Sequence, residues 1–582
     1  MKKQLYISSA FAILFGMTVK AQTKDKNIGT EEVRVVKAYE ATVVDAFKIK
    51  DNPEIGDEDN VKQEVKYTIY SFPVASTFSP EKGQAAAVDK DSLSPVFNNY
   101  ALLGYGNFNT IRGELGISEK VNDDIYVGGI LNHISSQGGI ANVLVDDKYS
   151  KSSLDFNVGS KKITNDWNAN FGVSQQNYNW YGLPSDVFIF APSEYGNRDF
   201  KQKYSDVHLG FKYDSNLGFF DGGTVHYKYF WDAYETKENH FVLKPKFNFD
   251  LEQVNLNVDL NLDYLSTNYA DQKNAGGKFE NNYFVFAAEP NIRISAENYN
   301  LQIGVGVANI SGSTSIQKDN SLAVYPKVKG NFDLVKNIVV AYAGAEGGVT
   351  NNSYANFVSQ NPFVSPDLQI MPTKQQYNLY VGMKGKLDHN ISYNVRVAYM
   401  SEDNKPMFVS NPISLSFDLL ENQTYQYGNS FGVTYDLVKT INAYGELNFN
   451  FKDNVLIDLY GEVNSYNADK GTVYNLPEAK FGAKLKMFFT DQWFGGLDVS
   501  FVGKRNDLGY VYNNDDVLER TKITVNSFAD FNLNVGYKAT EDWTFFAKGN
   551  NLFNQKIQMW NNYQVQGTQF LIGAMYKFNF NK

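Results

Sequence analysis

Residues 254–264 read V-N-L-N-V-D-L-N-L-D-Y, an alternation of apolar and polar side chains. Successive side chains of a β-strand point to opposite faces, so this stretch predicts a strand with one apolar and one polar face. The apolar face would carry Val254, Leu256, Val258, Leu260, Leu262 and Tyr264, and the polar face Asn255, Asn257, Asp259, Asn261 and Asp263. The same rhythm recurs from about residue 100 to the C-terminus. It predicts a sheet that separates two media.

Stretches far along the chain show the same division. Apolar and small residues alternate with Asn, Asp, Glu, Lys or Tyr in residues 441–451, 525–537 and 570–580. A soluble antiparallel sandwich also alternates, so this pattern alone leaves both architectures open. Three further features favour a barrel in a membrane.

The first feature is an N-terminus of the secretory type. Lys2 and Lys3 precede an apolar stretch from about Leu5 to Val19, and Val19-Lys20-Ala21 offers small residues for cleavage. We therefore predict a signal peptide over residues 1–21, followed by Gln22 rather than by a lipid-anchored cysteine. No later segment approaches ~18 consecutive apolar residues, so we expect no transmembrane helix. The chain has no cysteine, and a sheet closed by backbone hydrogen bonds needs no disulfide.

The second feature is the abundance of aromatic residues, which make up 15% of the chain with 39 Tyr and 43 Phe, although the mean hydropathy is negative. Barrels in bilayers combine these properties because only half of each strand meets lipid, while rings collect at the two interfaces. Trp167, Trp493 and Trp543 each follow a turn signal. We expect them to form an aromatic girdle at one membrane face.

The third feature is a regular alternation of long and short connections. Outer-membrane barrels have long outer loops and short periplasmic turns. Counting two short outer hairpins at 107–110 and 236–239, and treating 431–452 as one long strand, we predict eleven outer loops and ten inner turns, hence about 22 strands. The remaining predicted outer loops are 138–150, 183–200, 268–278, 313–320, 352–374, 402–423, 468–476, 508–522 and 560–568. The fold class is thus an all-β, transmembrane antiparallel barrel at 98–582, preceded by a short N-terminal periplasmic segment at 22–97.

A barrel of 22 strands is the size of the plugged outer-membrane transporters. The C-terminal run E-D-W-T-F-F-A-K-G-N-N-L-F-N-Q-K at 541–556, with G-T-Q-F-L-I-G-A-M-Y-K-F at 567–578, resembles the last two strands of TonB-dependent receptors. In that family an N-N-L-F-N-type motif closes the penultimate strand. The resemblance covers the barrel and implies an outer-membrane location and energy-coupled uptake of a ligand.

The N-terminal segment departs from this family. Residues 23–97 are too few for the family's complete plug domain. Thr30–Val36 is similar to the opening of such plugs or to the segment that pairs with TonB, which makes Glu31, Glu32, Val33, Val35 and Val36 candidate TonB contacts. A periplasmic linker strand is the alternative interpretation of this stretch.

Enzymatic chemistry finds little support in the sequence. His133, His208, His226, His240 and His389 are scattered without the spacing of a metal site. No G-x-S-x-G elbow or phosphate-binding loop is present. We expect no catalytic residue, no cofactor and no metal. The net charge of −10 gives no reason to expect nucleic acid as a partner, because phosphates demand basic patches.

The predicted outer loops are aromatic and polar. Rings there suit stacking on a sugar or packing against a peptide or a partner protein. The alternative is that they only form the outer girdle and pack the loops. The candidate contacts are Trp180, Tyr181, Phe188, Phe190, Phe357 and Phe363.

Two functions of different classes remain open. The first is a TonB-dependent-receptor-like transporter, in which a ligand binds the outer loops and crosses a lumen gated by the N-terminal segment. The second is a plug-deficient structural subunit of a larger outer-membrane complex, with a lumen filled by its own loops, residues 23–97 or a partner. The expected partners are outer-membrane lipids and, according to function, TonB, a surface lipoprotein or another outer-membrane barrel.

Overall fold

The computed structural model describes residues 99–580, except 163, 185–186, 188–197, 217, 252–253, 270–279, 316, 336–337, 415–422, 452–453 and 513–517. All of them belong to the second of the chain's two units, residues 68–582. Several predictions concern residues outside this part of the chain. They are the signal peptide, the segment 22–97, the candidate TonB contacts Glu31, Glu32, Val33, Val35 and Val36, and the ring residues Phe188 and Phe190.

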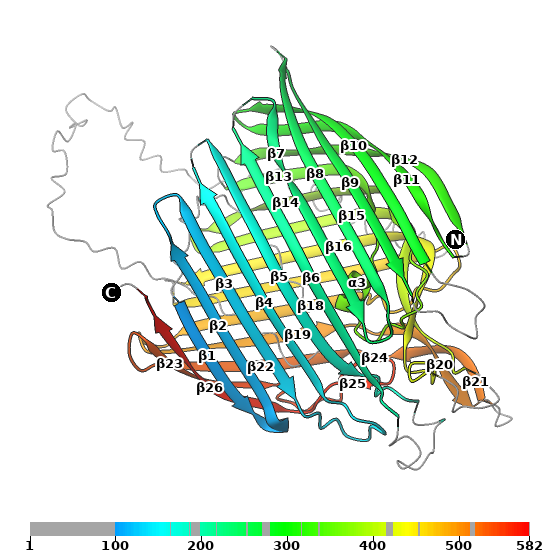
Figure 1. The fold of residues 1–582 in the computed structure, drawn as a ribbon. Coiled ribbons are helices and arrows are strands. Elements are labelled where there is room, and N and C mark those ends of the chain that lie inside the picture. Colours follow the sequence, from blue (N-terminus) through cyan, green and yellow to red (C-terminus); the bar gives the residue numbers. More distant parts are fainter. Residues whose placement is uncertain are drawn as a thin grey trace, which may run out of the picture. The chain divides into compact units, whose positions relative to one another are not determined.

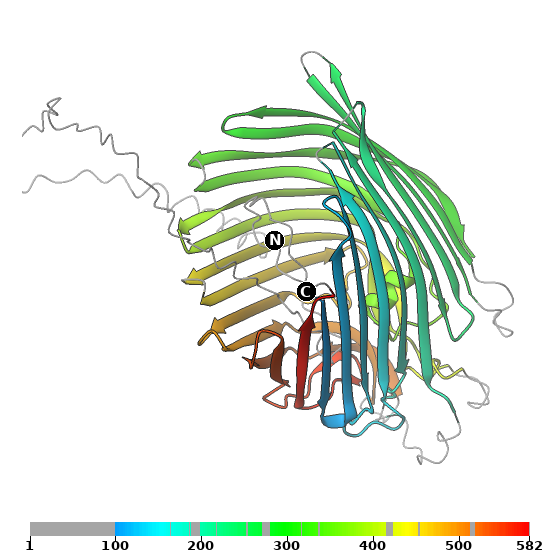
Figure 2. The same ribbon diagram turned by 60° about the vertical axis from the view of Figure 1, so that its left-hand side comes forward.

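One antiparallel sheet of 22 strands closes on itself (Figure 1). Each strand pairs with the next one along the chain, and the last strand, β26 (Gln569–Phe578), pairs with the first, β1 (Asn99–Gly106). Asn99 lies opposite Phe578 and Gly106 lies opposite Leu571 in this seam. Figure 2 shows the seam, where the red C-terminal strand lies beside the blue first strand. The predicted 22-stranded barrel is confirmed.

The strands between the two of the seam differ widely in length, and β16 is the longest with 21 residues. A strand needs only ~9–11 residues to cross a bilayer, so the longest ones extend well beyond it. The bounds are β2 Thr110–Lys120, β3 Ile125–Ser136, β4 Tyr149–Lys161, β5 Asn165–Asn179, β6 Lys201–Ser215, β7 Phe220–Asp232, β8 Lys237–Leu251, β9 Val254–Asn268, β10 Glu280–Ala296, β11 Tyr299–Thr314, β12 Lys318–Val335, β13 Val339–Thr350, β14 Thr373–Asp388, β15 Ile391–Ser410, β16 Phe431–Phe451, β17 Val455–Ala468, β18 Ala479–Phe488, β19 Trp493–Val502, β22 Phe528–Lys538 and β23 Trp543–Asn550.

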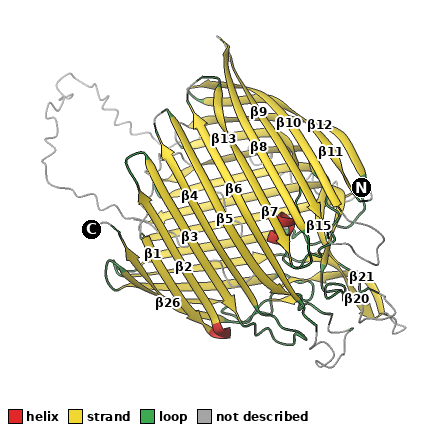
Figure 3. Cartoon of the chain, viewed as in Figure 1, coloured by secondary structure: helices red, strands yellow, loops and turns green. Residues whose placement is uncertain are grey.

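Two small hairpins and two short helical pieces lie in the described parts of the connections. The hairpins are β20 (Arg505–Tyr512) with β21 (Leu518–Val525), and β24 (Gln558–Trp560) with β25 (Tyr563–Gln564). The helical pieces are η1 (Asn107–Asn109) and α3 (Tyr354–Gln360), drawn in red in Figure 3. None of the described helices has the length and apolar character needed to span a bilayer.

Long and short connections alternate along most of the chain as predicted, but the predicted long loop 313–320 is wrong, because β11 continues to Thr314 and β12 begins at Lys318. The long ones gather at one end of the barrel, here called the outer end, and the short ones at the inner end. Residues 431–451 form one strand, as their continuous alternation predicts. The predicted loop 402–423 is wrong in its first part, because β15 continues to Ser410. A register shift between Glu402 and Lys405 interrupts the alternation there and hides the end of the strand.

The two faces of the sheet differ as the alternation predicts. Apolar side chains such as those of Leu322, Val324, Val381 and Ile572 point outward and are more than 60% exposed. Polar side chains such as those of Asn257, Asn442 and Glu446 point inward and are buried. Trp167, Trp493 and Trp543 lie at or near the inner ends of β5, β19 and β23. The rings of Trp493 and Tyr537 lie 4.7 Å apart, and those of Trp543 and Tyr576 lie 4.8 Å apart. The expected aromatic girdle therefore lies at the inner end of the barrel.

Candidate functional site: a core formed by the outer loops

Loop 351–372, which joins β13 to β14, is deeply buried. Among its residues only Asn356, Ser359 and Gln360 are exposed. It contains α3, which begins after Ser353, whose hydroxyl accepts a hydrogen bond from the backbone N–H of Asn356 at 3.1 Å. Pro362 follows the helix and cannot continue it. The loop is therefore a folded element, whose helix has an N-cap residue and is ended by a proline.

This loop bonds strands of the barrel wall on both sides of its own strands, β13 and β14. The hydroxyl of Tyr204 on β6 donates to the carbonyl of Pro362 at 2.8 Å. The amide of Asn281 on β10 donates to the carbonyl of Leu368 at 2.9 Å. On another wall, Phe431 of β16 exchanges backbone hydrogen bonds with Phe363 and Ser365. Loop 351–372 therefore crosses the lumen near its outer end.

Loop 351–372 and four other outer connections contribute buried residues to one hydrophobic cluster, which we call the loop core, and residues of two more connections, 137–148 and 233–236, pack against it. Trp180 contacts the rings of Tyr234 and Tyr425 at 5.1 and 5.4 Å between centroids. The side-chain amide of Asn429 donates to the carbonyl of Trp180 at 2.9 Å. The buried members are Trp180, Leu183, Phe200, Tyr204, Phe230, Tyr269, Tyr354, Ala355, Phe357, Val358, Phe363, Val364, Leu368, Ile370, Tyr425, Tyr427, Phe431 and Tyr563.

The four candidate loop contacts that the structure describes are gathered in this core. Trp180, Phe357 and Phe363 are at most 1% exposed, and Tyr181 is partly buried against the cluster. The hydroxyl of Tyr181 donates to the carbonyl of Gln564 at 2.7 Å. The structure thus shows these rings packing the loops, which was one of the two interpretations of the sequence. Their contact with a ligand or partner stays a prediction.

Buried carboxylates fasten α3 to the wall. Glu238 of β8 accepts hydrogen bonds from the backbone N–H groups of Tyr354 and Ala355, at 2.6 and 3.1 Å. The hydroxyl of Thr267 donates to the same carboxylate at 2.8 Å. Asp232 of β7 accepts the hydroxyl of Tyr354 at 2.9 Å, and burial raises the pKa of that phenol well above its usual value. Tyr354 is therefore a neutral donor at any physiological pH.

A second set of polar contacts holds the outer connections around β20 and β21. Asp507 accepts hydrogen bonds from both the backbone N–H and the hydroxyl of Ser410, each at 2.9 Å. Arg505 donates to the carbonyls of Met559 and Gln558 at 2.7 and 2.9 Å. Burial lowers the pKa of Arg505 to about 10, so the guanidinium stays charged at neutral pH. These contacts tie β15, β20 and the last outer connection together.

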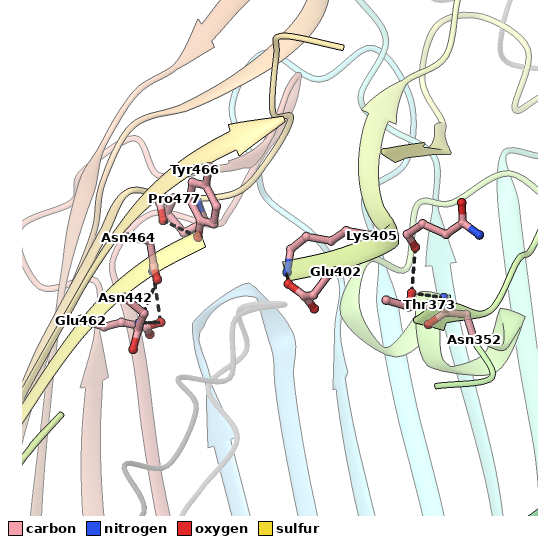
Figure 4. Close-up of polar contacts among 10 residues, drawn as sticks. Asn352, Thr373, Glu402, Lys405, Asn442, Glu462, Asn464, Tyr466 and Pro477 are labelled. Carbon is pink, nitrogen blue, oxygen red and sulfur yellow. Dashed lines mark hydrogen bonds and ion pairs between the residues drawn. The ribbon is translucent and has the colours of Figure 1, made fainter. Parts of the chain in front are cut away.

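The lumen wall is lined with paired polar groups (Figure 4). Asn442 donates to Glu462 and to Asn464, at 3.0 and 2.8 Å, and Lys405 pairs with Glu402. Glu446 accepts the hydroxyl of Tyr444 at 2.9 Å. Like these residues, Asp458 and Lys577 lie on the inward phase of their strands, as their positions in the alternation predict.

The histidines are less scattered than the sequence suggested. His208, His226 and His240 lie on the adjacent strands β6, β7 and β8, with the first two rings 6.2 Å apart. His240 contacts Asp263 at 2.9 Å, and Asn351 of the loop donates to that same carboxylate. Combining the inward phase with hairpins centred near 217 and 234 would have brought these histidines together. Within the described ranges, no group of His, Asp and Glu is arranged to hold a metal ion.

Several solved outer-membrane receptors resemble this chain in fold. The FrpB iron transporter of Neisseria meningitidis, F3-3 variant, superposes with a TM-score of 0.61 over 84% of this chain and 83% of that one, at 11% identity. The chain has the TonB-dependent receptor fold. The siderophore receptor PirA of Acinetobacter baumannii gives a TM-score of 0.58 at 11% identity, covering 83% of this chain and 80% of that one. The ferric yersiniabactin uptake receptor FyuA of Yersinia pestis gives 0.56 at 12% identity with the same coverage.

This TonB-dependent receptor fold places the chain in the cell outer membrane, with the long loops outside. At 11–12% identity the likeness concerns the fold alone. No protein-family model matches the chain, and no curated protein matches it in sequence.

Proposed function

We propose that this receptor-like barrel takes up a ligand across the outer membrane, and that the ligand first meets the outer loops. The observation that carries the proposal is the closed 22-stranded barrel shared with receptors whose names state iron or siderophore uptake. Ferric siderophores are accordingly the first ligand class to test. The paired polar groups below the loop core support a hydrated lumen, because an interior that is merely packed would carry apolar side chains there.

Energy coupling would act on the N-terminal segment. The candidate contacts with TonB are Glu31, Glu32, Val33, Val35 and Val36, and the barrel itself needs no catalytic residue. A surface lipoprotein that delivers the ligand is the further partner expected for this function.

The test is uptake of radiolabelled iron by the native bacterium grown under iron limitation. Cells are supplied with a panel of iron-loaded catecholate, hydroxamate and carboxylate siderophores. We expect loss of the gene to abolish uptake of one of them, and deletion of Thr30–Val36 to do the same while the barrel remains in the membrane. Unchanged uptake of every member in both strains would contradict the proposal.

A second candidate function is an accessory barrel in a larger outer-membrane complex. The observation that favours it is the loop core, whose rings are buried as in the interior of a soluble domain rather than displayed for capture. Gentle detergent extraction of the tagged protein followed by mass spectrometry tests it. Recovery with another barrel in fixed ratio supports the accessory function, whereas recovery with TonB or a surface lipoprotein supports uptake.

A further inference from the structure

We propose that the loop core is itself the barrier of the lumen, and that the carboxylate of Glu238 fastens it in the closed position. The inference does not rest on the proposed function, because a sealed lumen is compatible with either candidate. It assigns the barrier to the outer loops rather than to the segment 22–97.

The first support is the path of loop 351–372. Its partners are inward-facing groups on β6, β7, β8, β9 and β10 on one wall and on β16 on another. A loop that only folded over its own hairpin would contact β13 and β14 alone. The stacked pair Phe363 and Tyr563 joins this loop to the connection before the last strand. The loops thus meet one another across the lumen.

The second support is the way in which the loop is held. Apolar burial alone would allow the loop to slide, since it has no direction. Backbone groups at two separate places, Tyr354 with Ala355 and Leu368, are instead bonded to fixed side chains of the wall. Glu238 receives three hydrogen bonds and is 1% exposed, so releasing α3 would take two of the three from this carboxylate and leave only the one from Thr267. Closure is therefore the ground state of the barrel.

The absence of cysteine allows a direct test in the full-length chain. Val358 lies in α3 at 1% exposure, and a single Val358→Cys substitution reports whether the loop core opens to a water-soluble maleimide. Ala141→Cys, at an exposed position of loop 137–148, is the reactive control. We expect labelling of Val358→Cys to be at least ~100-fold slower than labelling of Ala141→Cys. Rapid labelling of Val358→Cys in the otherwise native chain would overturn the proposal.

Glu238→Ala is then added to the Val358→Cys background. We expect labelling to accelerate at least ~10-fold, and Glu238→Gln, which keeps one acceptor oxygen, to give an intermediate rate. Glu462→Ala is the matched control, because its carboxylate faces the same lumen and accepts hydrogen bonds from the wall residues Asn442 and Asn464. The altered mobility of the unheated barrel on gels shows which variants keep their fold. If Glu238→Ala does not fold, Tyr204→Phe, which releases the carbonyl of Pro362, takes its place.

Conductance in planar lipid bilayers measures the barrier itself. The full-length chain should show little conductance, and the folded Glu238→Ala variant should conduct steadily or in bursts. A folded variant that labels quickly but conducts no more than the native chain would place the barrier elsewhere and overturn the proposal. A folded variant that neither labels nor conducts would overturn the role of Glu238.

Discussion

The ring of Phe363 stacks on the ring of Tyr563, with centroids 3.6 Å apart and 18° between the planes. The two residues lie on connections from different parts of the barrel, and both are 1% exposed. The hydroxyl of Tyr563 also donates to the carbonyl of Asn429 at 2.5 Å, which brings in a third connection. This pair is the centre at which the outer loops become one folded unit.

Removing one ring of this pair should destabilise the outer end of the barrel. Phe363→Ala deletes a buried aromatic ring and leaves a cavity, a change that costs about 3–5 kcal/mol in tightly packed cores. We expect a lower midpoint of thermal unfolding in detergent. Tyr512→Ala, which truncates an exposed ring of β20, should leave the midpoint nearly unchanged. Equal midpoints for Phe363→Ala and the native chain would contradict the packing described for the loop core.

The stability of the outer connections should depend on pH through Asp507. Burial raises the pKa of this carboxyl, whereas in the unfolded chain its pKa is about 3.9. Above about pH 4 the unfolded chain releases its proton first, so the native chain loses stability as the pH rises through the folded-state pKa. In the Asp507→Asn variant the amide side chain at this position does not titrate. Its unfolding midpoint minus that of the native chain should therefore rise with pH from about 4 and then level off, and a difference that falls would contradict the buried position.

Arg505 should not be replaceable by lysine. Its two guanidinium nitrogens Nη1 and Nη2 donate to the carbonyls of Met559 and Gln558 at the same time. A lysine ammonium group cannot reproduce this planar pair of donors. We expect Arg505→Lys to cost about 1.5–3 kcal/mol, the value of hydrogen bonds to a charged donor. Lys504→Arg, at the exposed neighbouring position, should be neutral. Thermal unfolding of both variants in the same detergent is the measurement.

A charge on the outward face of the sheet should hinder insertion. Val381 is 61% exposed and lies beside the outward-facing Val397 near the middle of β14. An arginine there meets lipid, which costs about 2–4 kcal/mol at the bilayer midplane. Asn448→Arg faces the lumen near Glu446 and Asp458 and should be tolerated. The yield of folded barrel in lipid vesicles distinguishes the two, and equal yields would contradict the assignment of the faces.

The barrel could be predicted from the sequence because its signal is local. Alternation within each strand sets the two faces, and consecutive hairpins set the order, so 254–264 and 431–451 could be interpreted without knowledge of distant residues. The Asn-rich run 550–554 begins at the last residue of β23, where the resemblance to receptors implies the end of the penultimate strand, and Asn551 and Asn554 have positive φ.

The loop core could not be predicted in the same way. Trp180, Phe357 and Phe363 were recognised as aromatic loop residues, but nothing in their neighbourhoods states that they meet Tyr425 or Tyr563. Contacts between loops depend on the diameter and register of the closed sheet, which no single segment encodes. The proximity of His208, His226 and His240 is a different case, because it follows from the inward phase of three consecutive strands joined by two hairpins and could have been predicted from the sequence.

The seam between β1 and β26 has a consequence for the order of events in biogenesis. Residues 99–106 must wait for 571–578, the last strand of the barrel, before they acquire their second neighbour. A product that stops before residue 569 leaves the edges of β1 and β23 bare, and unpaired edges recruit other strands. Quality control of this protein is therefore concentrated in its final residues, and a late nonsense mutation should be as damaging as an early one.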